Sequence, residues 1–246
     1  MENMKYTMSY IAKNFRVALM LSLMMLLCSC SSEDKLELHK GATLPIMQGI
    51  ADNVPYIQSV EKELTYDLYD GVRITDVVFT YCAKPTRMII AEVDLNKNVT
   101  IVTSTPDNKP EVGKILQQVT VQAEKAEAAG RKVILGTNGD FYSKKNDLWI
   151  PGGLFYKDGV AIKTEIGWEA DHVFYMLKDG TAHITSVPEF KLVEREVVHA
   201  IGGWQRMVQD GEVVKNFTVN DNAMQFHPRT FVGAVSYTHL RAHETG

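Results

Sequence analysis

The chain has 246 residues, of which 45% are hydrophobic and 23% are charged, and its formal net charge at pH 7 is −4. This composition is typical of a globular protein and excludes a disordered, collagen-like or coiled-coil chain. A chain with no basic surplus is not expected to bind nucleic acid, and three cysteines cannot build a disulfide framework.

The first 29 residues have the features of a secretory signal. Residues 1–16 carry three basic residues against one acid, and Val17–Leu27 is an uncharged apolar run too short to span a bilayer. The following Leu27-Cys28-Ser29-Cys30 resembles a bacterial lipobox, which implies that Cys30 becomes the lipidated first residue of the mature protein. An ordinary cleaved signal with incidental cysteines is the alternative. We therefore expect a lipid-anchored protein of the cell envelope, on the periplasmic or surface face of the outer membrane, with residues 30–60 as a tether.

Short strands and one helix are expected next. The runs Arg87–Asp94 and Val99–Thr103 are separated by Leu-Asn-Lys-Asn and predict a hairpin. Apolar residues at helical spacing predict a helix over Lys114–Ala129, and the apolar run Val133–Leu135 predicts a buried strand. Cys82 follows a strand-like run and is expected to be a small buried residue rather than a nucleophile, because no histidine lies nearby in the sequence.

Three Asp-Gly turns follow, at Asp158-Gly159, Asp179-Gly180 and Asp210-Gly211. Asp-Gly tolerates the positive φ that tight hairpins require, so the recurrence predicts an antiparallel meander. The expected fold of residues 61–234 is therefore α+β: a sheet-rich antiparallel meander of hairpins with one helix–strand unit packed on it.

Residues 235–246 read VSYTHLRAHETG and resemble translated adapter read-through, so we expect a non-native tail after an incomplete domain. A genuine short C-terminal tail is the alternative reading.

Three glycine-marked segments are candidates for chemistry. The first is the loop Asn138-Gly139-Asp140 after the expected strand, where backbone N–H groups and a carboxylate can face one point. Asp140 is a candidate general acid or base if burial raises its pKa, and a plain turn cap otherwise. The second segment is the pair Gly152-Gly153, repeated as Gly202-Gly203, which indicates either close approach of a ligand or a bulge in a sheet.

The third segment is His227-Pro228-Arg229-Thr230. Arg229 has the fork geometry that suits a phosphate, although a lone surface arginine is usually only solvated.

The order of these segments resembles the phosphodiester glycosidase family. That family has an Asn-Gly-Gly-Phe-Phe loop, a Gly-rich entry to a Lys-Asp-Gly hairpin, a later Gly-Gly hairpin and a Pro-Arg-Thr-Ala-Ile-Gly strand. The matches here begin at Asn138, Gly152, Gly202 and Pro228. Asp140 stands where the family pattern usually has glycine, and the family's later Asp-containing glycine-rich loop is absent from this sequence. The resemblance to an enzyme therefore applies to the full-length protein, and an inactive 246-residue chain is the alternative.

The resemblance implies a hydrolase that releases a sugar from a sugar-phosphate diester, of the N-acetylglucosamine-1-phosphodiester type. By this resemblance, the catalytic candidates are Arg229, which would hold the phosphate, and Asp140, which would activate water; an acid in the absent segment is the alternative for the second role. The substrate-binding candidates are Asn138, Gly139, Gly202, Gly203, His227 and Thr230. No cofactor is expected; a divalent cation is compatible with the chemistry but has no ligand signature. The alternative is a non-catalytic glycan-binding lipoprotein of a polysaccharide-uptake system, in which Trp149, Trp168 and Trp204 stack on sugar rings.

Overall fold

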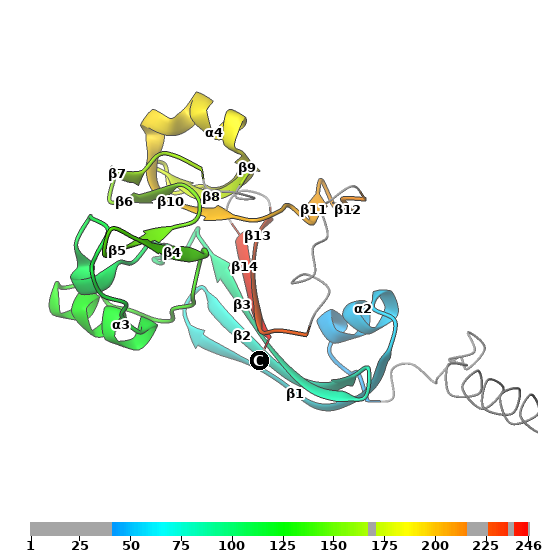
Figure 1. Ribbon diagram of the computed structural model, residues 1–246. Helices are drawn as coiled ribbons and strands as arrows, with labels where there is room; N and C mark the ends of the chain where they lie inside the picture. The colour runs from blue at the N-terminus through cyan, green and yellow to red at the C-terminus, as the bar shows by residue number, and fades with distance from the viewer. Residues whose placement is uncertain (1–40, 167–170, 216–225, 236–238, 246) are drawn as a thin grey trace, which may run out of the picture. The chain divides into compact units, whose positions relative to one another are not determined.

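The computed structural model describes residues 41–166, 171–215, 226–235 and 239–245 (Figure 1). The elements in these ranges belong to one compact unit, His39–Gly246. They form mostly antiparallel sheets with three short helices, which confirms the predicted sheet-rich α+β class.

The first sheet has the strand order β1-β2-β3-β14-β13, and the pairings between neighbouring strands are antiparallel. Its strands are β1 (Ile57–Tyr69), β2 (Val72–Tyr81), β3 (Lys84–Asp94), β13 (Arg229–Val235) and β14 (His239–Thr245). Opposite residues in the β2–β3 ladder share a face, so Val72 with Val93 faces one side and Val77 with Met88 faces the other. Both faces of the sheet are therefore apolar and require cover.

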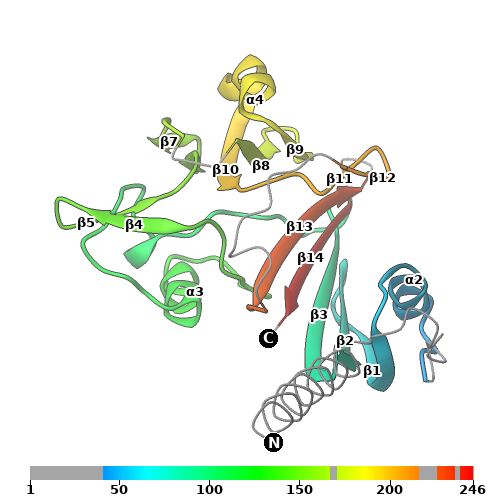
Figure 2. The same ribbon diagram turned by 45° about the vertical axis from the view of Figure 1, so that its right-hand side comes forward.

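The second sheet has the order β7-β6-β10-β8-β9 and is again antiparallel (Figure 2). Its strands are β6 (Phe155–Lys157), β7 (Val160–Lys163), β8 (His172–Leu177), β9 (Ala182–Ser186) and β10 (Val197–Gly203). Two separate hairpins are β4 (Tyr142–Lys145) with β5 (Leu148–Pro151), and β11 (Val208–Gln209) with β12 (Glu212–Val213). The helices are α2 (Pro45–Asn53), α3 (Val119–Ala128) and α4 (Val187–Val193), with 3₁₀ turns η1 (Pro106–Asn108) and η2 (Glu194–Glu196).

One hydrophobic cluster joins the two sheets. Val72, Ile74, Ala91 and Val93 of the first sheet and Phe174, Met176 and Ala182 of the second form it. On the other face of the first sheet, Met47 and Ala51 of α2 pack with residues of β1, β2 and β3. Phe190 of α4 packs on the second sheet with Leu154, Tyr156 and Tyr175.

All three predicted Asp-Gly turns form hairpins. Asp158 and Gly159 take φ values of 51° and 79° between β6 and β7, and Asp210 and Gly211 take 52° and 81° between β11 and β12. Gly180, at φ 85°, lies in the connection between β8 and β9. The turn chemistry therefore predicted these connections correctly.

The hairpin predicted between Arg87–Asp94 and Val99–Thr103 is wrong in its second half. The first run lies in β3, but residues 99–103 form no strand. The edge of β3 is occupied by β14 instead, with Leu240 opposite Val93. Thr103 instead donates its hydroxyl proton to Tyr156 O of the second sheet at 2.6 Å.

The predicted helix–strand unit is wrong in two respects: where its helix begins and whether its strand exists. The helix begins at Val119 rather than Lys114, because the Gln117 side chain is hydrogen-bonded to Asp107 in the η1 turn. Gln117 Oε1 accepts from Asp107 N at 2.9 Å, and Gln117 Nε2 donates to Asp107 Oδ1 at 3.0 Å. Val133–Leu135 is not a strand and is not fully buried, with Leu135 38% exposed. Ile134 alone of this run packs on the cluster between the sheets. A short apolar run does not by itself distinguish a paired strand from an extended connection.

Three terminal or local expectations also differ from the structure. Residues 45–60, expected in the tether, form α2 and the start of β1. Cys82 is exposed rather than buried, because Cys82 and Ala83 form the β2–β3 turn at φ 49° and 58°. Residues 239–245, excluded from the expected fold, pair with both β3 and β13. That residues 235–246 are a non-native tail stays a prediction. Cys30 lies outside the described residues.

Candidate functional site

The loop containing Asn138, Gly139 and Asp140 packs against β10. A Cβ atom added at Gly139 would lie 2.1 Å from Ile201 Cδ1, so a larger residue here would displace the end of the Ile201 side chain. The close approach places the loop beside Gly202 and fixes where Asp140 leaves it.

The Asp140 carboxylate is held by backbone donors on both of its oxygens. Phe141 N donates to Oδ1 at 2.7 Å, and Gly153 N donates to Oδ2 at 2.5 Å. Burial raises the pKa of Asp140 above its usual range, against the two N–H donors and the positive charge of Lys163. A partly buried carboxylate with a raised pKa has the properties of a general acid or base.

The paired glycines are the packing surface around this carboxylate. A Cβ at Gly202 would lie 2.5 Å from Gly153 Cα and 3.0 Å from Asp140 Oδ2. A Cβ at Gly152 would meet Asp140 Oδ1 at 3.3 Å, whereas one at Gly203 would meet only His172 O at 3.9 Å. Gly152 and Gly202 therefore make room for the carboxylate, and Gly203 does not contact it.

Thr230 is the member of the last segment that reaches the loop. Its hydroxyl donates to Asn138 Oδ1 at 2.9 Å, across 92 residues of sequence. Arg229 precedes Thr230 in β13, so its side chain leaves the opposite face of the strand. Its Nη1 donates to Pro228 O at 3.2 Å. His227 is exposed and lies before the strand. The structure thus brings together Asn138, Gly139, Asp140, Gly202 and Thr230, and it does not place Arg229 on the Asn138 side of β13.

Lys163 belongs to this site, although sequence reasoning missed it. It ends β7, and its Nζ donates to Gly152 O at 2.7 Å and to Gly153 O at 3.1 Å. Burial lowers the pKa of Lys163, while the nearby Asp140 and Glu165 carboxylates oppose that shift. The one feature of the sequence that could have pointed to Lys163 is its position at the end of the hairpin that follows Gly152-Gly153.

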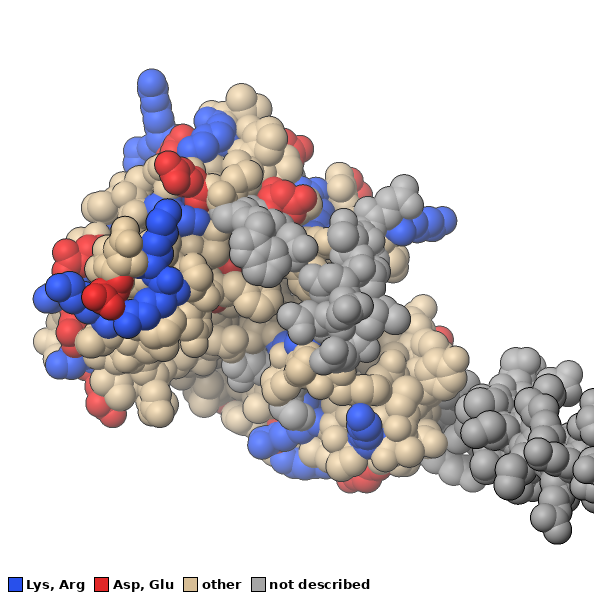
Figure 3. Space-filling view, viewed as in Figure 1, with Lys and Arg blue, Asp and Glu red and all other residues tan. Residues whose placement is uncertain are grey.

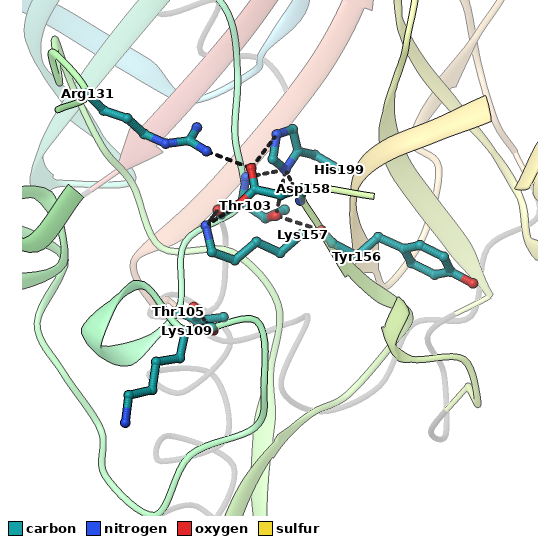
Figure 4. Close-up of polar contacts among 8 residues, drawn as sticks. All are labelled: Thr103, Thr105, Lys109, Arg131, Tyr156, Lys157, Asp158 and His199. Carbon is teal, nitrogen blue, oxygen red and sulfur yellow. Dashed lines mark hydrogen bonds and ion pairs between the residues drawn. The ribbon is translucent and has the colours of Figure 1, made fainter. Parts of the chain in front are cut away.

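A second polar cluster, also missed, lies at the β6–β7 turn (Figure 4). The fully buried Lys157 places Nζ 3.0 Å from Asp158 Oδ2, and Arg131 Nη2 lies 2.6 Å from Asp158 Oδ1. Burial alone would raise the pKa of Asp158, but these two cations lower it. Burial lowers the pKa of His199 to about 4, and its Nε2 is 3.6 Å from Asp158 Oδ1. This cluster ties β6, β10 and the 99–105 segment together.

The surface and the aromatic candidates add two observations. On the face shown in Figure 3, basic and acidic side chains are interspersed. Trp149 packs edge-on against the exposed Tyr142 with ring centroids 5.5 Å apart. Trp204 is half-buried, and its buried Nε1 has no hydrogen-bond partner among the described residues. Trp168 lies outside the described residues.

Within the described ranges, no group of three or more His, Cys, Asp and Glu side chains is placed to hold a metal ion. In the same ranges, no helix has both the length and the apolar character needed to cross a membrane.

Comparison with known proteins gives a family match over part of the chain. Residues 131–236 match the family model described as phosphodiester glycosidase. The matched range contains the Asp140 loop, both glycine pairs, Lys163 and Thr230. A comparison with curated proteins gives no match.

Proposed function

We propose that this chain hydrolyses the glycosidic bond of a sugar-phosphate diester, of the N-acetylglucosamine-1-phosphodiester type, at the bacterial cell envelope. The match of residues 131–236 implies hydrolase activity on a glycosidic phosphodiester. The observation that carries the proposal for this chain is the Asp140 carboxylate, which is partly buried and held by two N–H donors between Gly152 and Gly202 inside that range.

Asp140 is proposed to activate the attacking water. Each carboxylate oxygen has two lone-pair sites, and one backbone N–H donor occupies one site on each oxygen. The remaining sites can accept a proton from water, and a raised pKa makes the carboxylate a better base. A phosphodiester leaves as a stable anion, so the reaction needs charge stabilisation at the phosphate more than a strong acid.

Asn138 is proposed to orient a sugar or phosphate oxygen. The Thr230 hydroxyl donates to Asn138 Oδ1, so the Nδ2 group on the other branch of the exposed Asn138 amide points away from Thr230. Its N–H groups are donors. Asn138 and the Gly139 backbone then lie beside the carboxylate on one loop, with Gly202 packed beneath it. Arg229, whose side chain leaves β13 on the face opposite Thr230, stays a proposed phosphate contact, with His227 and Gly203 as proposed contacts to the substrate.

The test compares sugar release from an N-acetylglucosamine phosphodiester and from a neutral aryl glycoside. Asp140→Asn should slow both by about 10²–10⁴, the usual contribution of an acid–base group. The control is Asp147→Asn, because Asp147 lies on the nearby β4–β5 turn with its side chain 84% exposed. Asp140→Asn activity equal to that of the control variant would overturn the proposal.

Arg229→Ala separates the phosphate role from the rest of the site. A phosphate contact predicts a loss of about 10²–10³ on the phosphodiester, by analogy with removal of one oxyanion donor, and a smaller loss on the aryl glycoside. Arg229→Lys keeps the charge without the planar fork and should recover only part of the rate. Equal losses on both substrates would contradict a phosphate contact by Arg229.

A second candidate function, non-catalytic glycan binding, is favoured by one observation. Phe141 and Tyr142 follow Asp140 directly and are 67% and 59% exposed, and Trp149 packs beside Tyr142. Exposed aromatic rings of this kind stack on sugars. Saturable binding of an oligosaccharide with no sugar release by the wild-type chain would favour this function over hydrolysis.

A further inference from the structure

Lys163 and Asp140 contact opposite ends of one peptide group. Lys163 Nζ donates to Gly152 O at 2.7 Å, and the N–H of the same peptide, on Gly153, donates to Asp140 Oδ2 at 2.5 Å. A trans peptide is planar with its C=O and N–H pointing in opposite directions. Fixing the carbonyl with the ammonium therefore also fixes the direction of the N–H that holds the carboxylate.

We propose that Lys163 is a positioning residue for Asp140, acting through the Gly152–Gly153 peptide. This inference rests on the proposed function for its catalytic meaning, since Asp140 is the base proposed there. Lys163 holds two successive carbonyls, so rotation of the Gly152–Gly153 peptide would break its bond to Gly152 O, while its bond to Gly153 O restrains the next peptide.

The glycines make such a clamp necessary. Glycine on both sides of a peptide lowers the barrier to its rotation, because neither residue has a Cβ to restrict φ and ψ. A flipped peptide would present the Gly152 carbonyl oxygen to the Asp140 carboxylate, replacing an attraction with a repulsion. No side chain can be added at Gly202 to restrain the turn, because a Cβ there would lie 2.5 Å from Gly153 Cα.

The charge of Lys163 acts in the same direction as its geometry. An ammonium on the carbonyl polarises the peptide and strengthens its N–H as a donor to the carboxylate. The positive charge itself lowers the pKa of Asp140 against the effect of burial. The register of the hairpin, with Lys163 opposite Phe155, brings the ammonium to this turn.

The test uses Lys163→Met and Lys163→Arg in the full chain, with Lys144→Met as the matched control. Lys144 lies on the β4–β5 hairpin, where it is paired with Asp147 and exposed. The first readout is the titration of the Asp140 carboxyl carbon by NMR, which does not depend on turnover. Lys163→Met should shift that titration to higher pH, Lys163→Arg should shift it less, and Lys144→Met should leave it unchanged.

The second readout is the kinetics. Misplacement of a catalytic group costs up to about 10² in rate, so Lys163→Met should lower kcat by that order, with KM little changed and the limb of the pH profile set by Asp140 moved upward. An unchanged titration in Lys163→Met overturns the inference, as does a change confined to KM, which would place Lys163 on the substrate. If the wild type has no turnover, the proposed function fails while the titration still decides the role of Lys163. If Lys163→Met does not fold, the comparison of Lys163→Arg with the wild type decides it.

Discussion

His199 is a buried imidazole whose two ring nitrogens face different partners. The backbone N–H groups of Thr103 and Asp158 point at Nδ1 from 3.4 and 3.3 Å, and these groups can only donate. Nδ1 is therefore the acceptor, and the proton of the neutral ring lies on Nε2, toward Asp158. Protonating Nδ1 would place its N–H against two N–H donors, with the Thr103 hydroxyl oxygen 3.1 Å away as an acceptor, and next to the positive charges of Arg131 and Lys157.

The stability of the fold should consequently fall in mild acid. The pKa of His199 is about 4 in the folded state and about 6.5 in an unfolded chain, so the unfolded state binds the proton more strongly. The stabilisation by neutral His199 is complete above pH 6.5 and is lost as the pH falls toward 4, by about 3 kcal/mol at most. Urea unfolding between pH 7 and 4 measures this loss.

His199→Asn provides the comparison, because its amide oxygen can accept a hydrogen bond but does not titrate. Its free energy of unfolding should depend less on pH over this window than that of the wild type. His172→Asn is the control, because His172 pairs with the exposed Asp171. Parallel pH curves for the wild type and His199→Asn would contradict this prediction.

Single residues were predictable where the constraint was local. The Asp140 loop and the glycine pairs were predicted because a close approach between backbone segments requires glycine, and the glycines are visible in the sequence. Lys163 and His199 were missed because their partners are set by pairing between strands, and His199 lies 41 residues from Asp158. The opposite directions of Arg229 and Thr230 require the start and the face of β13, which the motif does not specify.

Among the elements, α2 shows how a segment of ordinary composition can be essential to a sheet. Met47 is fully buried, and it packs with Val77, Phe79, Met88 and Ile90 on the face of the first sheet opposite the second sheet. Pro45 opens the helix, where its missing N–H costs nothing. Gly49 has no atom within 4 Å of an added Cβ, so it is exposed helix surface.

Two substitutions in α2 should therefore have opposite effects. Met47→Ala should lower the free energy of unfolding by about 2–5 kcal/mol, because it removes buried side-chain volume. Gly49→Ala should raise it by about 0.5–1 kcal/mol, because alanine restricts the unfolded chain and fits the helix. Chemical denaturation of both variants measures the difference. A neutral Met47→Ala would mean that α2 does not cover this sheet in solution.

Prediction of the elements succeeded where turn residues have special backbone angles. Asp-Gly identified three hairpins, whereas the β2–β3 turn at Cys82-Ala83 adopts positive φ without glycine, asparagine or aspartate and was not detected. The Val99–Thr103 run has strand composition but no strand, because β14 takes the edge of β3. Which strand pairs at a given edge is decided by the whole sheet and is not encoded in either strand alone.

At the scale of the whole molecule, the two sheets share one core. The cluster of Val72, Ile74, Ala91 and Val93 with Phe174, Met176 and Ala182 joins the sheets within His39–Gly246. We propose that Cys30, which lies outside the described residues, carries a lipid that anchors the folded part to the envelope, since the lipobox-like sequence ends on it.

A lipid anchor predicts the distribution of the protein in the cell. The wild-type chain should enter the detergent phase with membranes, and Cys30→Ala should release it to the aqueous phase. A single acyl chain gives only marginal binding, so stable anchoring requires more than one chain on the cysteine and its glyceride. Cys82→Ala is the control, because that exposed thiol lies in the β2–β3 turn. Equal partition of Cys30→Ala and the wild type would contradict lipidation at Cys30.

The hydrogen bond between Thr230 and Asn138 joins residues that are 92 positions apart. A ribosome adds about 5–20 residues per second, so Thr230 is synthesised roughly 5–20 s after Asn138. Throughout that interval the nascent chain carries the Asp140 loop without the hydroxyl that orients the Asn138 amide. Full assembly of the site therefore waits until residue 230 has been synthesised, and a chain stalled before that residue would present the carboxylate but not the oriented amide.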